Sequence, residues 1–171
     1  MKRIEVLKTY KIYIGGKFPR TESGRFYEAT NASGRSIANM CKSSRKDIRN
    51  AVVAARKAQG AWQERTAFNR GQILYRIAEI LEGRKSQFIE ELMLQDSTKK
   101  AAQIEVNDCI DRIVYYAGWC DKFNQVASSV NPVSSSHFNF SSYEPTGLVG
   151  IISPESSSLF GLVSMLLPVI S

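Results

Sequence analysis

The stretch YEPTGLVGIISPESSSLFGLVSMLLPVIS, residues 143–171, decides the fold class of this chain. After a polar start it rises into the aliphatic residues 148–152, whose composition predicts a buried strand. Ser153 and Pro154 predict a turn, and the apolar segment 159–170 predicts a helix. A buried strand that turns into a helix normally leads into further strands of a sheet. We therefore expect the beginning of an α/β sheet that is not completed within this stretch.

Helical patterns fill much of the chain before this stretch. Ser44 followed by Asp47 forms a capping-box pattern, and apolar residues then recur at helical spacing. Thr66 and Ser86 predict the caps of a second and a third helix. A fourth, long helix is expected over residues 101–127, because apolar side chains recur along one side of that segment.

Shorter strand-like patterns flank the helices. Residues 10–18, YKIYIGGKF, place apolar arms on both sides of two glycines and predict a small hairpin. A short strand is expected over residues 36–41. Residues 128–136, rich in Ser, Pro and Asn, predict a connector, and residues 137–143, HFNFSSY, alternate like a strand. This order of elements predicts an α/β chain.

The composition limits the class of protein. With 43% apolar and 23% charged residues, a chain of 171 residues is expected to form one folded domain. Residues 1–25 hold seven basic and two acidic side chains, which is +5 of the total net charge of +7. A basic terminus suits either an anionic partner or a solvated edge. We expect no nucleic acid as partner, because no RNP-type motif, metal-finger spacing or basic helix with interleaved aromatics occurs.

The three cysteines indicate free thiols. Cys41, Cys109 and Cys120 are odd in number, lie far apart and form no CxxC motif. Together with the absence of a signal-peptide pattern in residues 1–17, this predicts a reducing, cytoplasmic location. The apolar tail of about 12 residues is shorter than the roughly 20 of a membrane span, so no membrane span is expected. No metal site is expected either.

Five segments, in order along nearly the whole chain, resemble the aldehyde dehydrogenase superfamily. They are YIGGKF (13–18), DIRNAVVAARKAQGAWQ (47–63), RGQILYRIAEIL (70–81), IDRIVYYAGWCDK (110–122) and YEPTGLVGIISP (143–154). The resemblance implies a partial aldehyde dehydrogenase-like domain over residues 1–171. Its parts would be an amino-terminal hairpin with short strands (1–45), a helical part (46–127), an oligomerisation-type arm (137–147) and the first βα unit of a Rossmann-like, incomplete cofactor domain (148–171).

The resemblance also implies a chemistry. The family oxidises aldehydes to carboxylic acids with NAD or NADP: a cysteine thiolate attacks the aldehyde, a hydride passes to the cofactor, and a glutamate activates water. By this resemblance Ile152, Ser153, Pro154 and Glu155 would line the cofactor site. Ser156 stands where the family has the asparagine that holds the oxyanion. Losing such a donor typically costs about 2.7–4 kcal/mol of barrier, and the alternative for Ser156 is a turn or helix-cap residue.

Other departures from the family pattern weigh against catalysis by this chain. No cysteine matches the family's nucleophile, and its catalytic glutamate is also missing. Residues 119–133, 137–140, 144–147 and 154–168 resemble most closely the degenerate second half of family 16 aldehyde dehydrogenases. We therefore expect a non-catalytic fragment or interaction segment that binds no cofactor alone. The alternative is part of an active NAD(P)-dependent enzyme whose catalytic region lies outside this chain.

The arm from His137 to Thr146 is expected to contact a partner. In the family the matching arm pairs with the sheet of a neighbouring subunit, and alternating Phe138 and Phe140 suit an apolar face that needs a partner. The expected partner is another aldehyde dehydrogenase-like subunit or half, bound through this arm and the apolar tail. As the only histidine, His137 is expected to be a polar surface residue.

Overall fold

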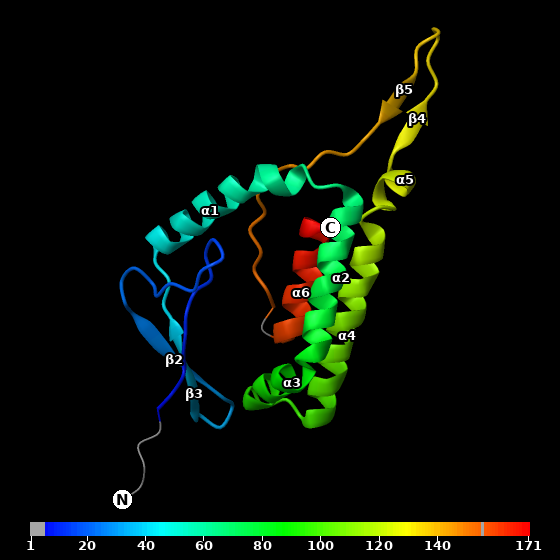
Figure 1. Ribbon diagram of the computed structural model, residues 1–171. Helices are drawn as coiled ribbons and strands as arrows, with labels where there is room; N and C mark the ends of the chain where they lie inside the picture. The colour runs from blue at the N-terminus through cyan, green and yellow to red at the C-terminus, as the bar shows by residue number, and fades with distance from the viewer. Residues whose placement is uncertain (1–5, 155) are drawn as a thin grey trace, which may run out of the picture.

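The computed structural model describes residues 6–154 and 156–171, and it combines a small sheet with a group of packed helices (Figure 1). This mixed architecture confirms the α/β class expected from the sequence. The elements in order are β1 (Thr9–Tyr10), β2 (Phe26–Thr30), β3 (Ser36–Cys41), α1 (Arg45–Gln63), α2 (Ala67–Gly83), α3 (Lys85–Leu94), α4 (Lys99–Trp119), α5 (Phe123–Ala127), β4 (Ser129–Asn131), β5 (Asn139–Ser141) and α6 (Ser158–Ile170).

The amino-terminal sheet has three strands. β3 lies in its centre, with β1 parallel on one side and β2 antiparallel on the other. Ahead of β2, Ile14 and Lys17 exchange two backbone hydrogen bonds of 3.0 and 3.1 Å around Gly15 and Gly16, whose φ angles of 59° and 78° suit a tight hairpin turn. The predicted turn is confirmed. Its arms form a single bridge instead of strands, because β1 pairs with β3.

The predicted capping box begins α1. Ser44 Oγ accepts from the backbone N–H of Asp47 at 3.3 Å, and the Asp47 carboxylate accepts from the N–H of Ser44 at 2.7 Å. The same carboxylate accepts from Thr21 Oγ at 2.5 Å and from the N–H of Glu22 at 3.0 Å. The start of α1 is therefore tied to the loop before β2. Further along the helix, Ile48 and Val53 remain 63% and 60% exposed.

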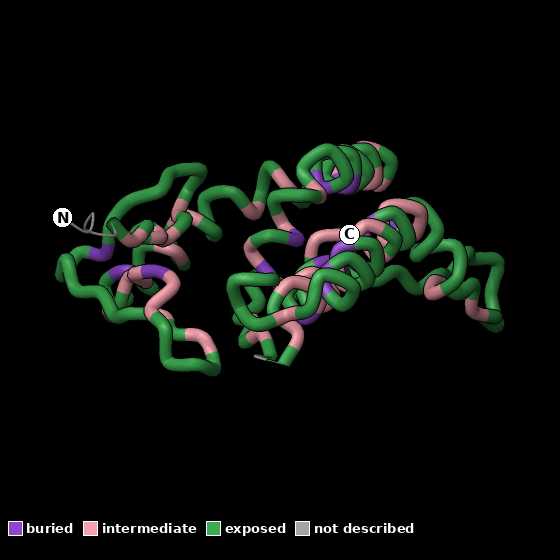
Figure 2. The backbone as a smooth tube through the Cα atoms, turned by 90° about the horizontal axis from the view of Figure 1, so that it is seen from below, coloured by how far each residue is buried: buried purple, intermediate pink, exposed green. Residues whose placement is uncertain are grey.

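The hydrophobic core lies among the helices. α2 and α4 run side by side and α6 lies against them (Figure 1). The main cluster joins Leu74, Ala78 and Leu81 of α2, Cys109 and Ile113 of α4, Cys120 after it, and Leu167 of α6. A second cluster joins Ile89 and Leu92 of α3 to Ala102 and Val106 of α4. Most residues outside these clusters are exposed or only partly buried, as Figure 2 shows.

One predicted helix cap is wrong. Thr66 caps α2 as expected, accepting from the N–H of Asn69 at 3.2 Å. Ser86, however, lies inside α3, which begins at Lys85 without a side-chain cap. α2 ends at Gly83, so Arg84 alone separates the two helices and leaves no room for a separate capping turn.

The region after α3 also differs from expectation. The helix predicted over residues 101–127 starts earlier, at Lys99, and is broken after Trp119, so that α5 forms separately. Residues 128–136, expected as a connector, contain β4, which pairs antiparallel with β5. The polar composition of β4 does not predict a strand, because the hydrogen bonds that stabilise it come from a partner strand eight or more residues away.

Residues 148–152 do not form the predicted strand. They pair with no other strand of the described chain. A strand is stable only where a neighbour accepts and donates its backbone hydrogen bonds, and such a neighbour is not among the described residues. The helix predicted after it is confirmed as α6. No helix in the described parts of the chain is both long and apolar enough to cross a membrane.

Candidate functional site

The candidate site lies at the turn between residue 152 and the start of α6. Along this turn Ile152 is 90% exposed, Ser153 is half-buried, and Pro154 and Ser156 are exposed. Glu155, the fourth residue expected to line a cofactor site, lies outside the described residues. Ile152, Ser153 and Pro154 are therefore consecutive residues of one segment at the surface, and Ser156 lies two residues further along the chain. These residues line none of the hollows described below.

A glycine brings the turn against α6. Gly161 is buried, and a Cβ at this position would lie 2.7 Å from Cγ of Pro154. The first turn of the helix can therefore pack on Pro154 only because residue 161 has no side chain. Ser153 Oγ is buried beside this contact without a hydrogen-bond partner in the described structure.

Glu105 of α4 caps α6 from outside the helix. Its Oε1 accepts hydrogen bonds from the N–H groups of Leu159 and Phe160, both at 3.0 Å, and from Ser157 Oγ at 3.4 Å. Ser157, at the N-cap position, makes no side-chain cap of its own. A carboxylate here satisfies otherwise unpaired N–H groups and suits the positive end of the helix.

Glu105 is the residue that sequence reasoning missed. A signal was present, because Glu105 is flanked on α4 by Ala102, Val106 and Cys109, which are buried at helical spacing. An acidic residue beside a buried stripe requires a partner. The partner, however, lies more than fifty residues further along the chain and could not be identified without the structure.

The Glu105 carboxylate lies where a cofactor phosphate would be expected to bind. In a βα unit, the N-terminus of the helix is the usual place for a phosphate group. At α6 that place is occupied by the Glu105 carboxylate, whose negative charge would oppose a second anion. This end of α6 does not fit the phosphates of NAD or NADP.

The buried cysteines are poor nucleophiles. Cys109 is fully buried, and burial raises its pKa to about 12, with smaller contributions from Glu105 and Asp108. Burial also raises the pKa of Cys120, whose Sγ lies 3.4 Å from the carbonyl oxygen of Tyr116. A thiolate, not a thiol, attacks an aldehyde. These two thiols therefore serve the core.

His137 and Ser156 belong to different parts of the chain. His137 lies between β4 and β5, where its Nδ1 is 2.9 Å from Ser135 Oγ, whereas Ser156 precedes α6. No hydrogen bond joins a base to Ser156 within the described structure. The described residues also contain no group of three His, Cys, Asp or Glu side chains that could hold a metal ion.

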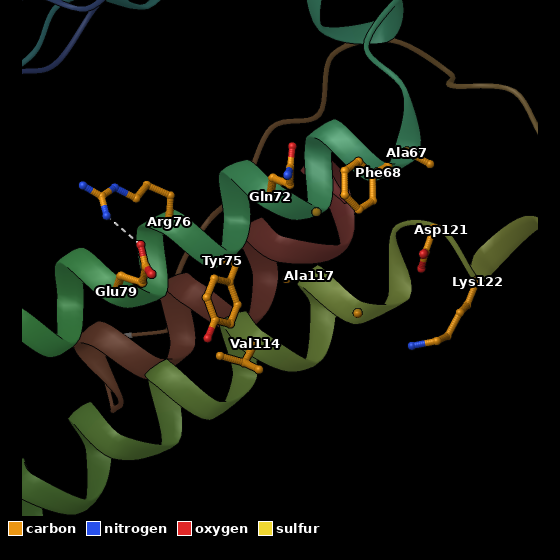
Figure 3. Close-up of a pocket in the computed structure, with 12 residues that line it drawn as sticks. Ala67, Phe68, Gln72, Tyr75, Arg76, Glu79, Val114, Ala117, Asp121 and Lys122 are labelled. Atoms are coloured by element: carbon orange, nitrogen blue, oxygen red, sulfur yellow. Dashed lines mark hydrogen bonds and ion pairs between the residues drawn. The ribbon is translucent and has the colours of Figure 1, made fainter.

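A groove of about 520 Å³ runs between α2 and α4 (Figure 3). Its floor is made of small residues because the helices approach closely there: a Cβ on Gly71 would lie 2.8 Å from the carbonyl oxygen of Ala117. Phe68 and Tyr75 form apolar walls. Arg76, which also lines the groove, is paired with Glu79 at 2.7 Å. The groove can accommodate an apolar group, but it contains no paired nucleophile and base.

Two further hollows lie between elements. One, of about 460 Å³, separates the amino-terminal sheet from α3, where Tyr10 donates a 2.6 Å hydrogen bond to Glu91. This bond is the main cause that lowers the pKa of Glu91. The other hollow lies where Arg112 of α4 stacks over the Phe160 ring of α6 at 4.9 Å. At the first hollow a hydrogen bond joins β1 to α3, and at the second a cation–π contact joins α4 to α6.

Comparison with known proteins places the chain in a well-populated group. Residues 18–170 match the model of the aldehyde dehydrogenase family. DhaS of Bacillus subtilis (strain 168) is 34% identical over 161 residues, covering 90% of this chain and 32% of that protein. Omega-crystallin of Enteroctopus dofleini is 30% identical over 171 residues, with 96% and 34% covered. The chain thus spans about a third of the length of these curated relatives.

Solved structures show the same fold. PnpE in complex with nicotinamide adenine dinucleotide superposes with a TM-score of 0.88 at 23% identity, covering 94% of this chain and 33% of that one. An aldehyde dehydrogenase from Bacillus cereus, a G224D mutant, superposes with a TM-score of 0.73 at 26% identity, with 81% and 28% covered.

Proposed function

The chain belongs to the aldehyde dehydrogenase family, and from this membership we propose that it packs against another aldehyde dehydrogenase-like unit and does not oxidise aldehydes by itself. The family reaction is an NAD(P)-dependent oxidoreduction, and the finer resemblance to the degenerate second half of family 16 is part of this proposal. So is a cytoplasmic location, which suits three free thiols.

The state of the thiols carries this proposal. Burial raises the pKa of Cys109 to about 12, so this thiol stays protonated at neutral pH. Burial also raises the pKa of Cys120. Cys41 lies on β3, far in sequence from the candidate turn. The described residues thus offer no nucleophile paired with a general base.

The hairpin of β4 and β5 supports the packing role. It extends away from the helices (Figure 1), and its outer edges pair with no strand of the described chain. Phe138 and Phe140 lie with ring centroids 5.6 Å apart and are 74% and 62% exposed. We propose that residues 137–146 pair with the sheet of another aldehyde dehydrogenase-like subunit, aided by the apolar face of α6.

A second candidate function is supported by the contacts on both sides of Glu155. Before it Pro154 packs on Gly161, and after it Glu105 accepts hydrogen bonds from the start of α6. In this alternative the chain is part of an active NAD(P)-dependent enzyme whose catalytic region lies elsewhere. Ile152, Ser153, Pro154 and Glu155 would then line the adenine and ribose, and Ser156 would donate to the oxyanion.

One experiment tests the first candidate, whereas the second, which places the catalytic region outside this chain, also predicts no reduced cofactor with the purified chain alone. The purified chain is mixed with aldehydes and with NAD or NADP, reduced cofactor is followed by absorbance, and mass is measured by light scattering. We expect no reduced cofactor and an associated species that Phe138→Ser with Phe140→Ser dissociates, while Val133→Ser, outside the arm, does not. Aldehyde-dependent reduction would overturn the first candidate, and a stable monomer that binds no hydrophobic dye would count against packing.

A further inference from the structure

One side of α1 is strongly basic. At about 100° per residue, all five basic side chains of this helix fall within an arc of about 120°. These exposed side chains, called the basic face here, are Arg45, Lys46, Arg49, Arg56 and Lys57. Of the five, Lys46 alone has an ion-pair partner in the described part of the chain, Glu22 at 2.9 Å. The single acidic residue of α1, Asp47, is buried on the other side of the helix, so nothing on α1 offsets the basic face.

A segment beside α1 adds to this positive charge. At one end of the segment the Cβ position of Gly15 lies 3.6 Å from Cβ of Ala54, and at the other end Glu22 forms the ion pair with α1. Between these two contacts the segment carries Lys17 and Arg20. Both are exposed, and neither forms an ion pair with a described residue. The chain therefore gathers cations from two stretches of sequence on and along one helix.

The rest of the chain does not share this charge. Residues 64–171 hold nine basic and twelve acidic side chains, whereas α1 holds five and one. Figure 1 shows α1 at the periphery of the molecule, away from the packed pair of α2 and α4. Because electrostatic screening extends over about 10 Å in 0.1 M salt, the neighbouring cations of the basic face act on a partner as one group. Such a concentrated positive field attracts an anionic surface.

Exposed apolar side chains lie among these cations. Val53 falls within the same arc of α1 and is 60% exposed. On the segment beside the helix Phe18 is 65% exposed, and its ring centroid lies 5.2 Å from that of Tyr13. Duplex DNA presents phosphates but gives such apolar groups no place to be buried. An anionic bilayer presents charged headgroups above an apolar interior, and therefore suits both kinds of side chain.

The shape of this surface also suits a bilayer. The three hollows described above contain no residue of α1 and no residue of the segment from 11 to 22. The basic face is thus the outer side of a helix and not the wall of a cleft. A convex face can lie on an extended flat partner, whereas a small anion or a single strand of nucleic acid is usually enclosed by a pocket or a groove.

We propose that the basic face of α1 binds the surface of an anionic lipid bilayer. Its Lys and Arg side chains contact the headgroups, while Val53 and Phe18 enter the boundary between headgroups and acyl chains. This binding surface goes beyond the packing role proposed above and does not depend on it, because residues 137–146 lie in another part of the chain. It is compatible with the proposed cytoplasmic location, since the cytoplasmic leaflet carries anionic lipids.

Flotation of the full chain with lipid vesicles tests this inference. Vesicles of phosphatidylcholine alone are compared with vesicles that also contain phosphatidylserine. We expect the chain to float with the anionic vesicles and to stay behind with the neutral ones. Raising the salt from about 0.1 M to about 1 M shortens the screening length from about 10 Å to about 3 Å, which should release the chain.

Reversing charges on the basic face should remove this binding. A variant that combines Arg49→Glu, Arg56→Glu and Lys57→Glu should bind anionic vesicles at least about tenfold more weakly, because each cation near such a surface contributes about fivefold. None of these three side chains has a hydrogen bond or an ion pair in the described structure, so the unfolding temperature should stay the same. The matched control places the same three charge reversals on exposed side chains elsewhere: Lys99→Glu, Lys100→Glu and Lys122→Glu.

Val53 distinguishes a bilayer from other polyanions. Val53→Ser should weaken binding to anionic vesicles about fourfold, the effect of withdrawing one methylene group from an apolar environment. Val53→Leu is its control and should bind like wild type. Binding of duplex DNA is measured with the same variants. Weak DNA binding that Val53→Ser leaves unchanged is expected, because only a bilayer can bury this side chain.

Other results would overturn the inference. It fails if neutral vesicles retain the chain as well as anionic ones, if the variant with a reversed basic face floats like wild type, or if the control reversals release the chain equally. DNA binding as tight as vesicle binding, with Val53→Ser floating like wild type, would assign the face to nucleic acid instead. A monomeric chain that floats with anionic vesicles would refute the packing role and support this inference.

Discussion

Glu105 joins α4 to the start of α6 through three hydrogen bonds. Two of them come from backbone N–H groups that α6 cannot satisfy itself, and the third comes from Ser157 Oγ. One side chain of the helical core therefore anchors the first turn of α6, which directly follows Ser156.

Replacing Glu105 should loosen this turn. Glu105→Ala removes the acceptor for two helix N–H groups and should lower the free energy of unfolding by about 1–2 kcal/mol. Glu105→Gln keeps an acceptor oxygen and should cost less. Gln103→Ala, an exposed change on the same helix, is the control. Chemical denaturation measures all three, and equal stability of Glu105→Ala and wild type would contradict the capping role.

Asp47 should make the chain sensitive to acid. Hydrogen bonds, first from Thr21 and then from the N–H groups of Ser44 and Glu22, hold the pKa of this carboxyl well below its usual value. Its contribution to stability is therefore complete above the pKa of unfolded aspartate, about 3.9, and is lost as pH falls towards the folded value.

The Asp47→Asn variant tests this prediction. It should be less stable than wild type at neutral pH, and the difference between the two proteins should shrink below about pH 4. Urea denaturation at several pH values measures both effects. A difference that stays constant down to strongly acidic pH would show that the carboxylate charge is not responsible.

At the scale of elements, sequence patterns predicted what is local. The capping box of Ser44 and Asp47 and the cap at Thr66 are formed within four residues, and both were predicted correctly. Ser86 was assigned wrongly because only Arg84 separates α2 from α3, a spacing set by tertiary packing. β4 was missed for a similar reason: its hydrogen bonds come from β5 and leave little trace in its own polar sequence.

In the candidate site, too, features set by neighbouring residues could be predicted, and contacts between distant residues could not. The helix over 159–170 could be predicted, because apolar periodicity is visible in sequence, whereas the turn expected at Ser153 and Pro154 is not assigned at these two residues. Glu105 could not be paired with α6, since that contact spans more than fifty residues. The strand over residues 148–152 was predicted from its composition and does not form, because pairing requires neighbours that the described chain does not supply.

The contact between α2 and α4 gives an element-scale prediction. In Gly71→Ala the new Cβ would lie 2.8 Å from the carbonyl oxygen of Ala117, so the helices must separate. We expect a loss of about 1–3 kcal/mol in the free energy of unfolding, reduced by alanine's better helix propensity. Gly60→Ala on α1 meets nothing within 4 Å and should be neutral or stabilising. Thermal unfolding compares the two variants, and equal stabilities would contradict close helix packing.

At the scale of the whole molecule, the distribution of apolar surface is uneven. α2, α3, α4 and α6 share two buried clusters, and large apolar side chains are exposed both on these helices and on α1, the β4–β5 hairpin and residues 148–152. Exposed apolar patches of this extent mark interaction surfaces. This exposure is the reason for the packing role proposed above.

The backbone of residues 144–154 makes no hydrogen bond to other described residues, and this has a consequence for proteolysis. A protease needs an extended, unbonded chain, which this segment offers just before α6. Brief digestion with a protease that cuts after large apolar residues should therefore cleave here first. α6 should stay bound after the cut, because Leu167 remains in the core and Glu105 still holds its first turn. The nicked protein would then run as two fragments in denaturing gels and as one species in native ones.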